Sequence, residues 1–206
     1  MPESNTRERI LSAAQNLFAK QGFSITTLRQ ITDKADVNLA AVNYHFGSKE
    51  QLLLAVAGRS IDRINKQRIV MLDSAEQNAN GAALEIKEIA KCFLIPAIND
   101  LFEDDEMPCI LSQAQNDQNT LLQEFIAERV KEVAQRFIVV IQKSLPHISL
   151  EVILARGEFM VGALLHTLQS HNKFSAKLAP NQPNLQERSF ITEQLVTFCT
   201  AGLSHE

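Results

Sequence analysis

The sequence is poor in the features that mark secreted, metal-bound or membrane proteins. Its three cysteines, Cys92, Cys109 and Cys199, are far apart and form no CxxC pair, which disfavours a disulfide framework or a cysteine-ligated metal. No apolar run approaches the about 20 residues of a membrane-spanning helix, and the polar segment before Ile10 contains no apolar signal region. We therefore expect a soluble cytoplasmic protein with reduced thiols.

Catalytic and metal-binding patterns are also missing. There is no Gly-rich phosphate loop, no GxSxG and no HExxH, so we predict that the chain is not an enzyme and uses no cofactor. His166 and His171 do not share a helical face, which favours surface or core histidines over metal ligands. The acidic run from Glu103 to Glu106 leaves a cation site conceivable, but a solvated loop is favoured because adjacent residues cannot all converge on one ion.

Helix boundary signals are dense between residues 22 and 38. Gly22 followed by Phe23 predicts the left-handed end of a first helix, with Phe23 folding back onto its last turn. Thr26 or Thr27 can cap a second helix, and Gln30, three residues after Thr27, would complete a capping box. The inward face of this second helix comprises Leu28, Ile31 and Ala35. Asp36, Val37 and Asn38 then form a short turn in which Asn38 caps a third helix.

The third helix is predicted over residues 39–46, with Val42 and Phe46 in the core. Gly47 should end it, and Ser48 with Gln51 should open a fourth helix through another capping box. Short helices joined by a tight turn are the layout of a DNA-binding helix-turn-helix. The alternative is a set of core helices with no nucleic-acid role, in which the Tyr-His-Phe run at residues 44–46 is a packed helix end.

The third helix leaves small and polar side chains on its other faces. Asn43 is suited to an adenine edge and the alanine methyls to a thymine methyl, while Tyr44, His45 and Lys49 are suited to phosphates. The predicted DNA-binding residues are Thr26, Thr27, Arg29, Asn38, Leu39, Ala40, Ala41, Asn43, Tyr44, His45 and Lys49.

Charge is unevenly distributed along the chain. Residues 1–70 contain ten basic and six acidic side chains, a net charge of +4, whereas residues 71–206 contain ten basic and eighteen acidic side chains, a net charge of −8. A basic N-terminal part in a modestly acidic protein favours DNA contact through one face and argues against a general nucleic-acid coat.

The rest of the sequence has helical periodicity almost throughout and no convincing strand. The helix opened by Ser48 is expected to keep a basic surface that includes Arg68 and to end near residues 78–81. Further helices are predicted over 82–102 with a kink at Pro96, over 120–145, over 149–171 and over 185–203, with a loop at 172–184. The predicted fold class is all-α.

Residues 7–57 resemble the N-terminal DNA-binding domain of the TetR family of bacterial transcriptional regulators. The resemblance is carried by the run ILSAAQNLFAKQGFSITTLRQITDKADVNLAAVNYHFGSKEQLLLAV. Tyr44, His45 and Phe46 occupy the positions at which the recognition helix of the family ends. Ser48 and Lys49 occupy the positions at which the next helix of the family begins. Ala40 and Ala41 replace the usual Gly-Thr pair, and Asn43 replaces a common aromatic residue. Base specificity therefore cannot be taken over from other family members.

The resemblance implies a helix-turn-helix DNA-binding domain over residues 1–50 and a helical effector-binding and dimerisation domain over residues 51–206. It implies a homodimer that binds a palindromic double-stranded DNA operator and a small-molecule effector that relieves repression. In the family the two helices before the C-terminus form a four-helix interface. The candidate residues for this interface, called the seam below, are Phe159, Val161, Leu164, Leu168, Leu195 and Phe198. For each of them the alternative is that it faces the core of its own subunit.

An effector pocket is implied within the helices from Ala82 to about His171. The candidate residues for the wall of this pocket are Phe93, Met107, Phe125, Phe137, Phe159 and Met160. For each of them ordinary core packing is the favoured alternative. They include no obvious cluster of charge, which favours an apolar effector. The stretches ITDKADVNLAAVNYHFGSK and FMVGALLHTLQS resemble the fatty-acid-responsive branch of the family, which implies a long-chain acyl compound. The alternative function is a helical protein-interaction module without specific DNA binding.

Overall fold

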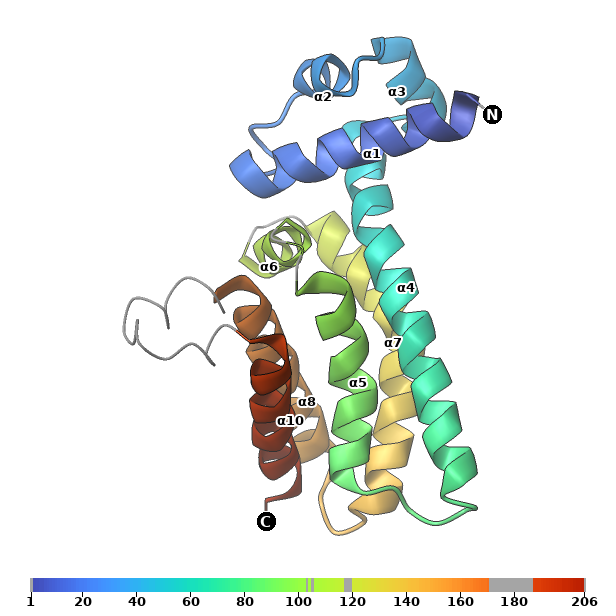
Figure 1. Cartoon of the computed structure of the whole chain (residues 1–206), viewed down its shortest axis with the longest axis vertical. Coiled ribbons are helices and arrows are strands. Elements are labelled where there is room, and N and C mark those ends of the chain that lie inside the picture. The colour runs from blue at the N-terminus through green and yellow to red at the C-terminus, as the bar shows by residue number, and fades with distance from the viewer. Residues whose placement is uncertain (1, 103, 105, 117–119, 171–186, 206) are drawn as a thin grey trace. The chain divides into compact units, whose positions relative to one another are not determined.

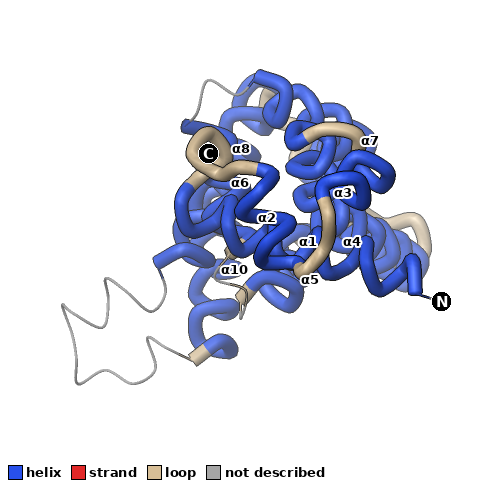
Figure 2. Tube along the Cα trace, turned by 90° about the horizontal axis from the view of Figure 1, so that it is seen from above, coloured by secondary structure: helices blue, strands red, loops and turns tan. Residues whose placement is uncertain are grey.

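The computed structural model of the chain describes residues 2–102, 104, 106–116, 120–170 and 187–205. These described residues form nine helices and no strand, which confirms the all-α prediction (Figures 1 and 2). They pack as two compact units, one of Met1–Asp62 with Glu106–Arg129 and the other of Arg63–Asp105 with Val130–Glu206. None of the described helices is long and apolar enough to cross a membrane.

The first unit is built around a small apolar core shared by its N-terminal helices. It contains α1 (Pro2–Gln21), α2 (Leu28–Ala35), α3 (Leu39–Phe46), the start of α4 (Lys49–Asn78), α6 (Met107–Asn116) and the start of α7 (Thr120–Ser144). α1 packs against α2, α3 and α6. Among the residues completely or almost completely removed from solvent are Ile10, Phe18, Ile31, Val42 and Leu52. The short helices α2 and α3 each bury one or two apolar side chains in this core. This burial stabilises them, because short isolated helices are unstable in water.

The second unit is a bundle of longer helices. It contains the rest of α4 and α7 with α5 (Ile86–Leu101), α8 (Leu150–Ser170) and α10 (Arg188–Ser204). α5 packs on α8 and α10, and in Figure 1 it runs between α10 and α4. α4 ends where expected, because Asn80 (φ 48°) and Gly81 (φ 88°) adopt left-handed backbone conformations. α5 begins four residues later than predicted, after that turn.

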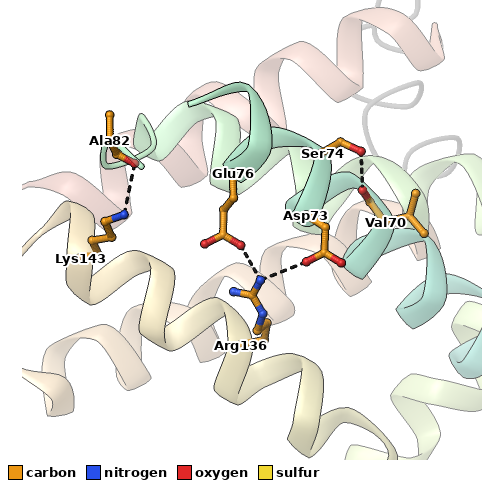
Figure 3. A network of polar contacts seen from close by, with 7 residues as sticks. All are labelled: Val70, Asp73, Ser74, Glu76, Ala82, Arg136 and Lys143. Atoms are coloured by element: carbon orange, nitrogen blue, oxygen red, sulfur yellow. Dashed lines mark hydrogen bonds and ion pairs between the residues drawn. The ribbon is translucent and has the colours of Figure 1, made fainter. Parts of the chain in front are cut away.

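Polar contacts of α7 with α4 and with the turn that follows α4 lie along one stripe of α7. In the second unit the Arg136 guanidinium donates to Asp73, at 3.0 Å, and to Glu76. One heptad later the Lys143 ammonium donates to the carbonyl of Gly81 at 2.9 Å (Figure 3 shows its neighbour Ala82, the second acceptor). Residues seven apart lie on one helical face, so these contacts fix the rotation of α7 against α4. Both Arg136 and its partners are partly exposed, so each ion pair contributes only about 0–1 kcal/mol.

Arg68 is buried inside the second unit, with 8% of its surface exposed, so the prediction that it keeps the surface of α4 basic is wrong. An arginine side chain has an apolar stem long enough to pack in a core, and charge patterning alone does not reveal this. The predicted loop at 172–184 lies outside the described residues.

Candidate nucleic-acid interface

Three local caps set the boundaries of α2 and α3. The Thr27 hydroxyl accepts from the Gln30 backbone N–H at 3.2 Å while the Gln30 side chain accepts from the Thr27 N–H at 2.9 Å. This reciprocal pair is the predicted capping box. The Asn38 carboxamide oxygen accepts from the Ala41 N–H at 2.9 Å and caps α3. Gly47 (φ 78°) ends α3 at Phe46, so the predicted helix over 39–46 is confirmed.

The turn between α2 and α3 is tied to α1 as well as to its own helices. Asp36 has a left-handed backbone (φ 51°), and the Val37 N–H donates to the Thr32 carbonyl at 3.1 Å. The Arg9 guanidinium donates to the Asp36 carbonyl at 2.6 Å and pairs with its carboxylate at 3.1 Å. The sequence did not single out Arg9, because a partner 27 residues away leaves no local signal. Contacts with α1 and contacts with α2 therefore both stabilise the conformation of the turn.

α3 buries one edge and presents the other to solvent. Val42 is fully buried and Phe46 nearly so, and the Arg7 guanidinium lies 5.4 Å from the centre of the Phe46 ring. On the other side Asn43 is exposed and 78% of Tyr44 is accessible. A short helix of this kind, anchored from behind and open in front, fits the major groove of DNA.

The start of α4 is fastened to the segment between α1 and α2. The Lys49 ammonium donates to the carbonyls of Phe23, at 3.0 Å, and Thr26, at 2.9 Å. It also lies 4.3 Å from the centre of the Phe23 ring. Phe23 itself packs on Phe18 with ring centres 5.6 Å apart, as expected for a residue that folds back onto the end of α1. The Lys49 ammonium, which is predicted to contact a phosphate, thus also makes these intramolecular contacts.

The predicted DNA-binding residues differ in accessibility. Thr26 is buried, and its hydroxyl donates to the Gly22 carbonyl at 2.7 Å. Ala41, His45 and Lys49 are half-buried. The remaining predicted residues are all exposed, and they are Thr27, Arg29, Asn38, Leu39, Ala40, Asn43 and Tyr44. The contacts of all of them with DNA stay predictions.

The predicted interface residues on α8 and α10 differ in exposure. Phe159 and Phe198 are 72% and 68% exposed, which is unusual for phenylalanine. Leu164, Leu168 and Leu195 are buried within the chain, while Val161 is half-buried. Of the two predictions made for Phe159, the interface therefore fits its exposure better than the wall of an internal pocket.

The other predicted wall residues do not form one group. Met107 and Phe125 belong to the first unit, where Met107 is fully buried and the Arg129 guanidinium lies 4.4 Å from the Phe125 ring centre. Phe93 and Phe137 belong to the second unit and touch edge to face, with ring centres 5.3 Å apart. Met160 is buried in the same unit. No group of three metal-ligating side chains occurs among the described residues.

Comparison with known proteins gives matches at both ends of the chain. Residues 10–56 match the family model described as "Bacterial regulatory proteins, tetR family". Residues 106–202 match the model described as "Tetracyclin repressor-like, C-terminal domain". A regulatory protein of the tetR family from Rhodococcus RHA1 has the same fold, with a TM-score of 0.72 at 14% identity over 96% of both chains.

Two curated relatives match over shorter stretches. The HTH-type transcriptional regulator LmrA of Bacillus subtilis is 32% identical over 91 residues, which are 44% of this chain and 48% of LmrA. The HTH-type transcriptional repressor AcnR of Corynebacterium efficiens is 35% identical over 60 residues, which are 29% of this chain and 32% of AcnR. The chain thus spans half or less of the length of these two relatives.

Proposed function

Because this chain belongs to the TetR family of DNA-binding transcriptional regulators, we propose that it is a ligand-relieved repressor that binds a palindromic operator as a homodimer in the cytoplasm. It is a regulator and not an enzyme. The observation that carries the proposal is the outward face of α3, where Asn43 and Tyr44 are exposed over the buried anchors Val42 and Phe46. Repression, rather than activation, is supported by the similarity to AcnR, a repressor by its name.

The positions of the two family matches support a division of labour along the chain. We propose that residues 1–50 bind DNA and that residues 51–206 bind the effector and dimerise. Within the first part, Asn43 and the alanines of α3 would contact base edges, while Arg29, Tyr44 and His45 would contact phosphates. Phosphate contacts set affinity and its salt dependence, whereas base contacts set sequence preference.

Dimerisation is supported by the exposed rings on α8 and α10. Phe159 and Phe198 together offer the apolar surface that soluble proteins usually cover with a partner. One eight-residue helix can contact only a few base pairs, whereas two related by a dyad would read half-sites about 34–36 Å apart or a multiple of this. The palindrome therefore follows from the dimer.

Relief of repression would follow from a change in the spacing of the two DNA-binding heads. An effector that binds the non-matching spacing a few kcal/mol more tightly would release the operator. We propose an apolar effector, with long-chain acyl compounds as the first candidates. Thermal-shift titration of the full chain with oleate and oleoyl-CoA tests the acyl candidates, and binding of neither at micromolar concentrations would exclude them.

The operator proposal is tested by selecting bound fragments from random duplex DNA and measuring their affinity by fluorescence anisotropy. We expect a palindrome, a steep salt dependence, and a changed base preference for Asn43→Ala. Gln67→Ala, an exposed change on α4 outside the proposed interface, is the control and should leave affinity and preference unchanged. Recovery of no palindromic sequence would contradict the proposal, and so would an Asn43 variant with unaltered preference.

A further inference from the structure

Arg68 stands apart from the other buried polar residues of the chain. Those described are Thr26, Thr32, Ser60, Asn65 and Arg68, and only Arg68 carries a charge. A buried ion is costly unless an opposite charge compensates it. The neighbours of Arg68 therefore decide whether its charge is satisfied within the chain.

The contacts of Arg68 are all with uncharged groups. Its Nε donates to the Phe93 carbonyl at 2.9 Å and its Nη1 to the Asn65 carboxamide oxygen at 3.4 Å. The guanidinium carbon lies 3.8 Å from the centre of the Phe93 ring. No carboxylate among the described residues pairs with Arg68, and burial lowers its pKa to about 10. At neutral pH the side chain is still a cation.

Two more exposed arginines of the same unit have the carboxylate partners that Arg68 lacks, whereas Arg156 and Arg188 donate to the neutral oxygens of Leu203 and Asn99. Arg63, one turn and a half earlier on α4, pairs with both carboxylate oxygens of Asp100. Arg136 pairs with Asp73 and Glu76. Arg68 thus differs from the other arginines without a carboxylate partner in being buried, so water does not solvate its charge.

A purely structural role would not require a charge at this position. Pro96 lacks an N–H, so the Cys92 carbonyl four residues earlier loses its helical donor, and the hydrogen-bond ladder of α5 is disturbed next to Phe93, whose carbonyl Arg68 bonds. A neutral amide could make the same bond at a lower desolvation cost. Apart from the contact of the guanidinium with the Phe93 ring, the charge has no compensating partner among the described residues.

We propose that Arg68 recognises the carboxylate of the effector, and that the apolar part of the effector lies against Phe93 and Phe137. A guanidinium binds a carboxylate through two parallel hydrogen bonds. Phe93 is half-buried and already holds the guanidinium against its face, while Phe137 meets it edge to face. The effector is therefore an apolar monocarboxylate. This inference rests on the proposed effector-responsive function and adds the chemical class of the head group.

The test is to titrate the full chain with a panel of monocarboxylates from benzoate to oleate, each beside its matched primary alcohol and alkyl phosphate. Calorimetry gives the affinities of the wild-type chain, Arg68→Gln and Arg68→Lys. Lys66→Gln removes an exposed positive charge from the same helix and is the matched control. We expect at least one carboxylate to bind tenfold or more tightly than its alcohol, a preference lost in Arg68→Gln, partly kept in Arg68→Lys and unchanged in Lys66→Gln.

Several results would overturn the assignment. These are a carboxylate preference that survives in Arg68→Gln, a stronger preference for the alkyl phosphate, or no carboxylate that binds more tightly than about 1 mM. Operator affinity of each variant without effector is measured in parallel. We expect Arg68→Gln to bind DNA as the wild type does, so loss of the carboxylate preference with operator binding intact separates this inference from the proposed function. If Arg68→Gln does not fold, Arg68→Lys decides: a carboxylate preference reduced in Arg68→Lys and unchanged in Lys66→Gln supports the assignment. A preference that Arg68→Lys leaves unchanged, or that the wild type does not show, refutes it.

Discussion

Replacing Phe198 by Asp should separate the dimer into monomers without unfolding the chain. Phe198 lies on α10 and is 68% exposed in the single chain, so little of its ring contributes to the core. Surface substitutions of this kind usually change the free energy of unfolding by less than about 0.5 kcal/mol. An effect on self-association much larger than this would therefore arise from an interface and not from damage to the fold.

The size of the effect follows from the exposed area of the ring. A phenylalanine buries about 150–250 Å² when fully covered, so the exposed share of Phe198, 68%, corresponds to about 100–170 Å². At about 25 cal/mol per Å² this area is worth about 3 kcal/mol. A two-fold dimer contains the residue twice, which gives about 6 kcal/mol, or about four orders of magnitude in the dissociation constant.

Analytical ultracentrifugation over a range of protein concentrations measures this constant, and circular dichroism checks that the helices remain. Val139→Asp is the control, because Val139 is 61% exposed on α7 of the same unit, outside the predicted seam. The reasoning is refuted if Phe198→Asp stays dimeric at the wild-type concentration range. It is equally refuted if Val139→Asp dissociates to the same extent.

Three further outcomes are expected. Asn38→Ala removes the cap of the Ala41 N–H and should cost about 1 kcal/mol of stability in urea unfolding, while Asn38→Ser, which keeps a capping oxygen, should cost much less. Lys49→Met keeps the apolar stem over Phe23 but loses two hydrogen bonds, so it should lower thermal stability as well as DNA affinity, and a loss of affinity with unchanged stability would show that the intramolecular bonds are unimportant. Arg136→Met breaks a partly exposed pair and should cost no more than about 1–2 kcal/mol in urea unfolding, decreasing at high salt.

The boundaries of the candidate DNA-binding helices could be predicted because their causes are local. The Thr27 capping box spans three residues, and so does the Asn38 cap. Gly47 ends α3 through its own backbone conformation. Interactions of this range are visible in the order of residues along the chain. The family resemblance added the functional interpretation, which the matches to residues 10–56 and 106–202 then supported.

The packed structure was needed to tell which apolar residues of α8 lie in the core of the chain and which are exposed for an interface. Apolar residues occur on nearly all sides of this helix, so its periodicity does not distinguish Phe159, which is exposed, from Leu164, which is buried. The partners on α5 and α10 decide which side is covered. The wall candidates were scattered over both units for the same reason.

Local chemistry along the chain thus settled the boundaries of α2 and α3 and their caps, because each depends on neighbours within about four residues, whereas α6 (Met107–Asn116) was not predicted. The burial of Thr26, the fastening of Lys49 to carbonyls 23 and 26 residues away, and the uncompensated charge of Arg68 emerged only on folding. A long cationic side chain can extend into water or pack its stem in a core. Which of these occurs depends on the helices that come to lie beside it.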